Sequence, residues 1–259
     1  MTTDAFEIDA LKLYMGNPYV INDNIIISQP KIKDIVNYGE QSYYSMVSTL
    51  VAISSDMKSQ LDSMGLDYEQ VSDFEVFVML VQALPKERTE ILLGNVDLSK
   101  MHLFKNPQND EIVLIDKESG IVIDRFLYER IVTYIRKMHG LKKKVERAKN
   151  AITKKILIEE DRKKKEQNKN VPYQSFLLPL ISSVKVRQGY TLDYVNNMGI
   201  VELMSEIERL QIINNADALL HGLYGGMIDS KGIDKKNLNW MRDLNDDPKP
   251  NRQVEKPKK

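Results

Sequence analysis

Hydrophobic residues in the first half of the chain recur at the spacing expected for helix faces. From Tyr43 onward, the apolar positions that share one predicted helical face are Met46, Val47, Leu50 and Ile53. Ser72 and Glu75 have the spacing of a capping box, in which each side chain accepts a hydrogen bond from a backbone N–H. This box predicts the start of a second, strongly apolar helix that ends at Pro85.

Two more helices are predicted from residues that favour helix ends. Pro85 is suited to the first turn of a short helix, and Gly94 to its C-terminal stop. Asp124 is suited to cap the second of these helices, whose apolar stripe ends at Gly140. The first half of the chain is therefore predicted to be rich in short helices.

Two runs of β-branched residues predict small hairpins between these helices. Residues 19–28 place Tyr-Val-Ile and Ile-Ile-Ile around Asn22-Asp23-Asn24, residue types that tolerate turn geometry. Residues 111–124 repeat the arrangement around a polar turn that contains Gly120. Pro30 then fits the first turn of the helix that follows the first hairpin, because its missing N–H would be unpaired there.

The pattern changes at Leu141 and divides the chain. Residues 141–170 contain 12 Lys or Arg and 5 Asp or Glu, a net charge of +7, which predicts a charged helical connector. Residues 171–244 predict an all-helical domain, and the Pro- and charge-rich residues 245–259 predict a disordered tail. We therefore expect a mainly α protein, with an α+β N-terminal domain at 1–140 that contains two small hairpins.

Composition is that of a globular protein kept in a reducing compartment. The chain has 42% hydrophobic residues, a formal net charge of 0 and no cysteine, so neither a disulfide framework nor thiolate chemistry is expected. The N-terminal residues do not have the pattern of a signal peptide, and no window is apolar enough for a membrane-spanning helix. We expect the protein to act in the cytoplasm, without contact with a membrane.

Residues that carry catalytic or metal chemistry are sparse. The three histidines, His102, His139 and His221, have no second histidine or carboxylate at the spacing of a metal motif. The acidic run Glu159-Glu160-Asp161 points in several directions on a helix, and the chain has no phosphate-binding glycine motif or nucleophile elbow. We therefore expect a protein that is not an enzyme, with no catalytic, cofactor-binding or metal-binding residues.

The segment LNWMRDL, residues 238–244, contains the only tryptophan. Leu238, Met241 and Leu244 share one predicted helical face, and Trp240 lies beside it. A last helix docking on the core of the second domain is the favoured interpretation. The alternative is a partner-binding patch, since Trp and Met are enriched at protein interfaces.

The basic connector raises a separate hypothesis, a regulator that binds nucleic acid through residues 141–170. Lysine and arginine supply affinity for phosphates. However, the segment has no aromatic residue on which bases could stack, and acidic residues interrupt its basic run. These features favour a solvated helix or linker over a nucleic-acid-binding arm.

Several stretches resemble proteins from the tail-gene region of phages and prophages of Gram-positive bacteria. They are the hairpin followed by Q-P-x-I-x-D-I-x-x-Y-G-E at residues 29–40, SDMKSQL at 55–61, LIEEDRKKKEQNK at 157–169, FLLPLISS at 176–183, and LNWMRDL. The hairpin–proline–helix opening is shared among proteins described as tail assembly chaperones. The chain departs from the better-known members in its length, its second helical domain and its charged connector.

The resemblance implies a non-catalytic factor that binds other tail proteins while the particle is assembled. Its implied partners are the tape measure protein and the tail tube protein, and a second copy of this chain is a further candidate. The implied location is the cytoplasm of the bacterial host. A permanent structural component of the virion, such as a tail-completion or baseplate protein, is the alternative implied by the same surfaces.

Overall fold

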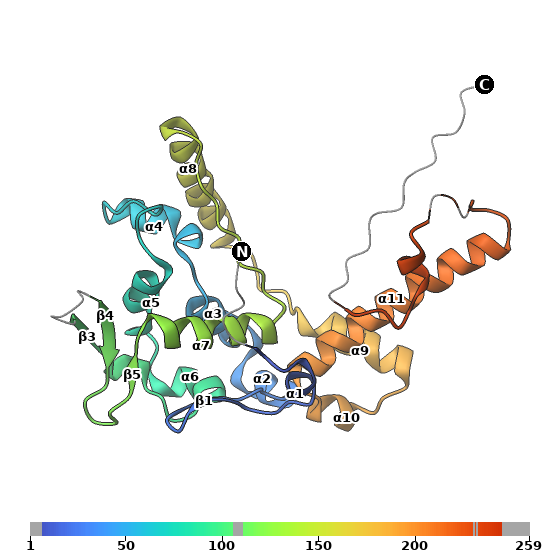
Figure 1. Cartoon of the computed structure of the whole chain (residues 1–259), viewed down its shortest axis with the longest axis horizontal. Helices are drawn as coiled ribbons and strands as arrows, with labels where there is room; N and C mark the ends of the chain where they lie inside the picture. The colour runs from blue at the N-terminus through green and yellow to red at the C-terminus, as the bar shows by residue number, and fades with distance from the viewer. Residues whose placement is uncertain (1–6, 106–110, 230, 232, 245–259) are drawn as a thin grey trace.

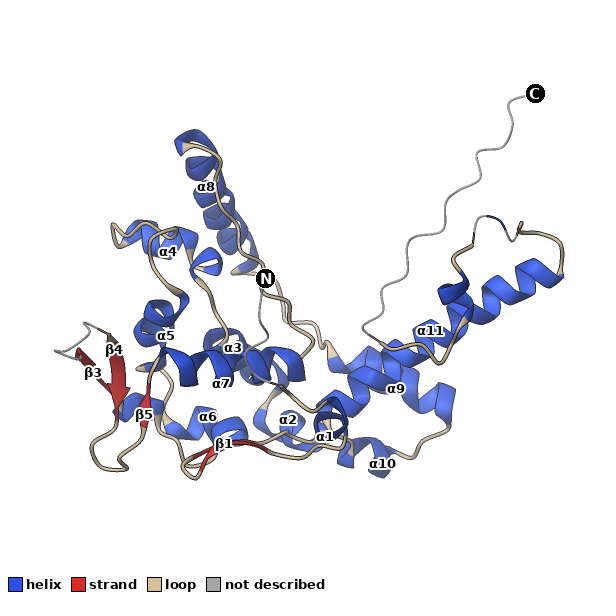
Figure 2. Cartoon of the chain, in the orientation of Figure 1, coloured by secondary structure: helices blue, strands red, loops and turns tan. Residues whose placement is uncertain are grey.

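Helices make up most of the structure, a computed structural model that describes residues 7–105, 111–229, 231 and 233–244. They account for 57% of the described residues and strands for 8%, so the prediction of a mainly α fold is confirmed (Figure 2). The predicted disordered tail, residues 245–259, lies outside the described residues.

The elements follow one another along the chain as drawn in Figure 1. The helices and 3₁₀ turns before residue 140 are α1 (Ala10–Tyr14), α2 (Ile32–Tyr38), α3 (Glu40–Leu50), η1 (Ser54–Asp56), α4 (Lys58–Ser63), α5 (Asp73–Val81), α6 (Lys86–Leu93), η2 (Leu98–Lys100) and α7 (Arg125–Met138). Those after it are α8 (Ala151–Asn168), α9 (Leu177–Gln188), α10 (Leu192–Asn197), α11 (Ile200–Tyr224) and η4 (Lys235–Leu238). The strands are β1 (Tyr19–Asn22), β2 (Ile25–Ile27), β3 (His102–Lys105), β4 (Ile112–Ile115) and β5 (Val122–Ile123).

The predicted helix caps are formed by the expected side chains. Ser72 Oγ accepts from the N–H of Glu75, and Glu75 Oε2 accepts from the N–H of Ser72 at 2.7 Å, which completes the capping box of α5. Asp124 Oδ1 accepts from the N–H of Leu127 at 2.8 Å at the start of α7. Gly94 ends α6 with a φ of 57°, a conformation that glycine adopts without strain.

Several helix boundaries differ from the prediction. Helix α5 ends at Val81, before Pro85, and Pro85 is the N-cap of α6 and not a residue of its first turn. Helix α3 starts at Glu40 and ends at Leu50, so Ile53 lies beyond it and does not share its face. Pro30 is not in the first turn of α2, which begins at Ile32. Pro30 instead uses its carbonyl in a long-range hydrogen bond, described below, which sequence periodicity does not reveal.

Both predicted hairpins are present. Strands β1 and β2 pair antiparallel, and Asn22 Oδ1 accepts from the N–H groups of Asn24 and Ile25 to close the turn. Strands β4 and β5 form the second hairpin. A strand that was not predicted, β3, adds to it, giving a sheet of order β3-β4-β5.

A backbone junction joins the C-terminal helices to the first hairpin region. The N–H of Ile32 donates to the carbonyl of Met198 at 2.9 Å, and the N–H of Ile200 donates to that of Pro30 at 3.3 Å. These bonds flank an antiparallel bridge between Lys31 and Gly199. Helices α2 and α10, far apart in the sequence, therefore pack side by side.

A second link fixes the start of α9. Glu40, the first residue of α3, accepts from Ser175 Oγ at 2.6 Å and from the N–H of Leu177 at 2.8 Å. The main hydrophobic core accordingly contains buried residues from both parts of the chain, including Ile35 and Met138 from the first and Val184 and Leu203 from the second.

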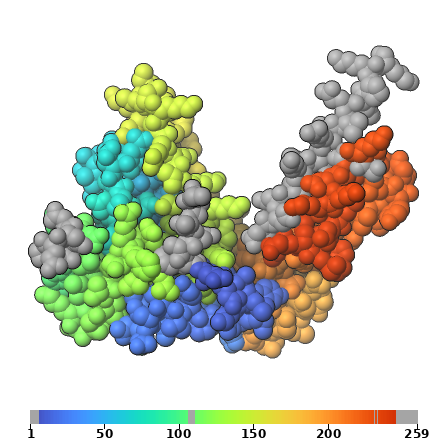
Figure 3. All heavy atoms as spheres, in the orientation of Figure 1, coloured from blue at the N-terminus to red at the C-terminus, as the bar shows by residue number. Residues whose placement is uncertain are grey.

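Two helices project from this body (Figures 1 and 3). Helix α8 has no buried residue and lies against α4. Helix α11 extends beyond α9 and is lined by the C-terminal segment that includes η4. None of the helices in the described part of the chain combines the length and apolar content needed to cross a membrane.

Candidate functional site

The predicted partner-binding segment does not form the expected helix. A 3₁₀ turn covers Lys235–Leu238, and the chain then turns without forming an α-helix. Asn239 has an extended backbone, and its Oδ1 accepts from the N–H of Met241 at 3.1 Å. Such a local side-chain hydrogen bond competes with helix formation. The predicted helical face of Leu238, Met241 and Leu244 is therefore wrong.

The four predicted residues nevertheless lie in the C-terminal segment that folds back along α11 (Figure 1). Arg209 Nη1 donates to the carbonyl oxygens of Trp240 at 2.6 Å and Arg242 at 2.9 Å, which holds the segment through its backbone. Leu238 and Leu244 are half-buried, whereas Trp240 is 48% and Met241 69% exposed. Leu238 and Leu244 are thus partly buried, as docking requires, whereas partner binding by Trp240 and Met241 stays a prediction.

Other apolar side chains are exposed on the same part of the chain. Val186 on α9 is 84% exposed, and Tyr224 and Met227 at the end of α11 are 88% and 86% exposed. We call the adjacent residues Trp240 and Met241 the C-terminal apolar surface; Val186, Tyr224 and Met227 are further exposed apolar residues in this part of the chain. Neighbouring large apolar side chains that are exposed to water form a patch, and such patches mark sites of interaction with other molecules.

A groove of about 490 Å³ lies beside this segment. Its walls come from α1, the end of α7 and α11, and Met241 and Leu244 line it from the C-terminal side. The exposed thioether of Met241 is adaptable in shape, which suits it to contact with another protein surface.

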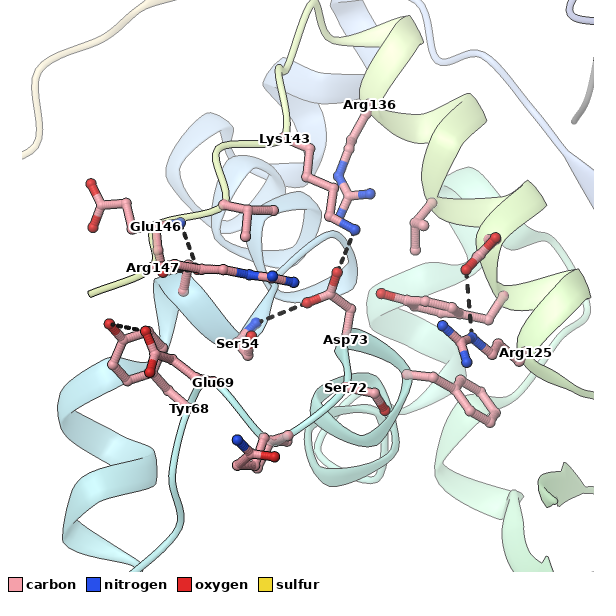
Figure 4. A pocket seen from close by; sticks show the side chains of 18 of the residues that line it. Ser54, Tyr68, Glu69, Ser72, Asp73, Arg125, Arg136, Lys143, Glu146 and Arg147 are labelled. Atoms are coloured by element: carbon pink, nitrogen blue, oxygen red, sulfur yellow. Dashed lines mark hydrogen bonds and ion pairs between the residues drawn. The ribbon is translucent and has the colours of Figure 1, made fainter. Parts of the chain in front are cut away.

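A second, charged pocket of about 540 Å³ lies on the opposite part of the molecule, between η1, the start of α5, α7 and residues 143–147 (Figure 4). Arg136, Lys143 and Arg147 converge around the carboxylate of Asp73. Asp73 accepts from the N–H of Ser54 at 3.1 Å and pairs with Lys143.

Tyr128 forms part of the floor of this pocket. Its ring packs against Phe74 and Phe77, with centroid distances of 5.3 and 4.9 Å. The hydroxyl is buried and lies within reach of Arg136. Burial, with a smaller contribution from Asp73, raises the pKa of Tyr128 to about 12, and Arg136 opposes the shift. The phenol is therefore a neutral donor at physiological pH.

The sequence alone does not reveal this pocket. Its lining side chains come from segments that are distant in the sequence; Ser72 was recognised only as a helix cap and Ser55 only as part of the stretch SDMKSQL. The basic residues of 141–170 were counted as a solvated segment, so no signal singled out Arg147.

The histidines occupy three different environments. His102 is exposed at the start of β3, His221 is exposed on α11, and His139 is buried at the end of α7. Asp161 accepts from Ser59 and so ties α8 to α4, whereas the pairs Asp161–Lys165 and Glu159–Arg162 lie within α8. No group of three metal-ligating side chains is found within the residues that the structure describes.

Comparison with known proteins finds one family model that matches the C-terminal part of this mainly α chain. Residues 163–245 match the family model described as YomV second domain. This family is associated with phages and prophages, so a phage or prophage origin is supported. The match covers the end of α8, α9 to α11 and the whole C-terminal apolar surface. No curated protein and no solved structure matched the chain.

Proposed function

We propose that the protein is a phage tail assembly chaperone-like factor that binds other tail proteins without catalysing a reaction. The observation that carries the proposal is the C-terminal apolar surface, where Trp240 and Met241 are exposed although Arg209 fixes their backbone. Aromatic and methionine side chains held in this way are typical anchors of protein interfaces. Such a surface suits the apolar helices of a tape measure protein.

The charge distribution supports a protein partner over nucleic acid. Lys143 pairs with Asp73, Lys154 with Asp67 and Glu69, and Arg162 with Asp62, so part of the basic charge of 141–170 is matched within the chain. Cations that are already paired release fewer counterions on binding phosphates, which lowers affinity for nucleic acid.

Co-expression with the tape measure protein of the same phage tests the proposal. The two proteins should co-purify, and the tape measure protein should be soluble only in the presence of its partner. Trp240→Ser combined with Met241→Ser should weaken the affinity of the complex at least about thirtyfold, because an interface anchor contributes about 2 kcal/mol or more. Identical solubility of the tape measure protein with and without this chain would contradict the proposal.

A matched control is offered by the opposite end of the molecule. Leu103 on β3 is an exposed apolar residue like Met241, and Leu103→Ser should leave the complex intact. Thermal unfolding of all variants should agree within about 0.5 kcal/mol, as for most surface substitutions. Mass spectrometry of purified particles separates the proposed chaperone, which should be absent, from a structural virion component, which should be present at a fixed copy number.

A further inference from the structure

Three tyrosines and two glutamates gather where α1 meets the start of α11, next to α10 (Figure 1). The rings of Tyr190 and Tyr194 lie 4.6 Å apart and are inclined by 44°, and the hydroxyl of Tyr194 donates to Glu202 at 3.3 Å. Glu206 follows Glu202 by one helical turn on the same face of α11. Burial, followed by Glu206 and Glu202, raises the pKa of Tyr14 at the end of α1. We call these five residues the tyrosine–glutamate surface.

The two glutamates of this surface have no cation of their own. No lysine or arginine forms an ion pair with Glu202 or Glu206 within the described part of the chain. Glu202 accepts from the N–H of Gly199 and from Tyr194, and Glu206 accepts from Gln188 Nε2 at 3.5 Å. Glu202 is the largest cause of the raised pKa of Tyr194, and no neighbouring cation opposes it. The negative charge at this surface is therefore not neutralised by an ion pair.

Two of the three tyrosine rings are open to water. Tyr194 is 49% and Tyr14 39% exposed, whereas Tyr190 is half-buried against the main hydrophobic core. The face of a tyrosine ring attracts an ammonium or guanidinium group. Carboxylates attract the same groups, so this surface combines two kinds of affinity for a cation.

The chain contains an occupied example of the same combination of groups. Lys154 Nζ lies 5.4 Å from the centroid of the Tyr68 ring and pairs with both Asp67 and Glu69. One tyrosine and two carboxylates thus hold a lysine that comes from another helix. The tyrosine–glutamate surface offers a similar set of groups to a cation from outside the chain.

We propose that the tyrosine–glutamate surface binds an arginine or lysine side chain of a partner protein. The partner is assigned as a different protein because Lys143, Lys154 and Arg162 of the basic connector are already paired within the chain. This contact goes beyond the proposed function, which depends on Trp240 and Met241, and it uses neither of these residues. The partner segment is expected to be basic, in contrast to the apolar segment that suits the C-terminal apolar surface.

Calorimetric titration of the full-length protein with three short peptides, at constant ionic strength, tests the surface. The peptides have the same length and carry arginine, lysine or citrulline at three positions separated by glycine. Citrulline has the shape of arginine without its charge, so the arginine and lysine peptides should bind at least about tenfold more tightly than the citrulline peptide. Citrulline bound as tightly as arginine, or no saturable binding at millimolar concentration, would overturn the proposal.

Substitutions locate the binding. Glu202→Gln combined with Glu206→Gln should weaken binding of the arginine peptide about tenfold, because close charge pairs across an interface are lost. Tyr194→Leu removes a ring face and should weaken it about two- to fivefold. Glu160→Gln combined with Glu166→Gln makes the same change in net charge at exposed positions on α8, so affinity should change by no more than about twofold. Equal losses in the two double variants would refute the surface.

The double variant at the surface also serves as its own folding control. Glutamine can accept the hydrogen bonds that Glu202 receives from Gly199 and that Glu206 receives from Gln188, so thermal unfolding should be unchanged. Sedimentation should give the same mass for the wild-type protein and the double variant. Salt-sensitive self-association that the double variant abolishes would assign the surface to a second copy and overturn the proposal. Loss of peptide binding with retained tape measure binding, or the reverse, would separate this proposal from the proposed function.

Discussion

His139 illustrates how one buried side chain couples stability to pH. Its Nδ1 lies 2.8 Å from the carbonyl oxygen of Ile135, and its Nε2 lies 2.7 Å from the hydroxyl of Tyr43. A carbonyl can only accept, so Nδ1 carries the proton and Nε2 accepts from Tyr43. Burial lowers the pKa of His139, although the hydrogen bond to Ile135 opposes the shift. The folded protein therefore holds this imidazole neutral.

Acidification should destabilise the protein through this residue. Because the folded pKa is lowered, the unfolded chain binds the proton more readily, and stability is lost as pH falls below the ordinary histidine pKa of about 6.5. Urea unfolding between pH 7.5 and pH 5 should show this loss. His139→Gln should flatten the dependence over this range, whereas His102→Gln, at an exposed position, should not. An unchanged slope in His139→Gln would show that other groups cause the effect.

At the scale of elements, α8 differs from the other long helices in what holds it. Lys154 pairs with Asp67 and Glu69, and Arg162 with Asp62, while Ile158 is the only α8 residue packed on the small core of Ala52, Leu61, Tyr68 and Val76. Helix α7 instead buries an apolar face that includes Ile131 and Ile135. Electrostatic contacts therefore hold α8, and apolar burial holds α7.

Salt should release α8 selectively. Raising ionic strength from about 0.01 M to about 1 M shortens the screening length from roughly 30 Å to about 3 Å and weakens exposed ion pairs. Amide hydrogen exchange in residues 151–168 should then become faster, while exchange in α7 should remain slow. Equal protection of α8 at both salt concentrations would mean that its apolar contacts are sufficient.

The elements that were predicted correctly are those whose signals are local. Ser72, Asp124 and Gly94 act on neighbouring backbone groups, so their spacing identified the helix ends. Strand β3 was missed because only two of its residues are apolar and its partner strand, β4, is needed to recognise it. The role of Pro30 was misread because its carbonyl bonds to Ile200, a contact that no local pattern encodes.

The candidate sites, too, were predicted only where the signal is local in the sequence. Trp240 and Met241 were identified from composition and are exposed, but the helix expected to present them was excluded by the Asn239 turn. The charged pocket is lined by Tyr128 and Arg147, which come together only through tertiary packing.

At the scale of the whole molecule, Gly199 is placed where the two parts of the chain meet. A Cβ atom at this position would overlap Oε1 of Gln29, whose Nε2 donates to the carbonyl of Leu13 at 2.9 Å. The φ of −72° is accessible to any residue, so the restriction at Gly199 comes from its neighbour and not from its backbone.

Gly199→Ala should therefore weaken the junction. We expect a destabilisation of about 1–3 kcal/mol, the usual cost of overpacking, measured by urea unfolding. In a Gln29→Ala background the same substitution should cost less, because the overlapping oxygen is gone; this double-mutant cycle isolates the pair. Equal costs in the two backgrounds would show that the contact with Gln29 does not limit this position.

The junction also has a consequence for synthesis of the protein. Lys33 and Asn197, which bond across it, are 164 residues apart. At translation rates of about 5–20 residues per second, the ribosome needs roughly 10 to 30 s to pass from one to the other. Throughout that interval the N–H of Ile32 lacks the Met198 carbonyl that satisfies it in the finished fold. A nascent chain released before residue 198 would leave the backbone N–H of Ile32 without this partner. Premature termination should therefore yield a product that associates with other chains.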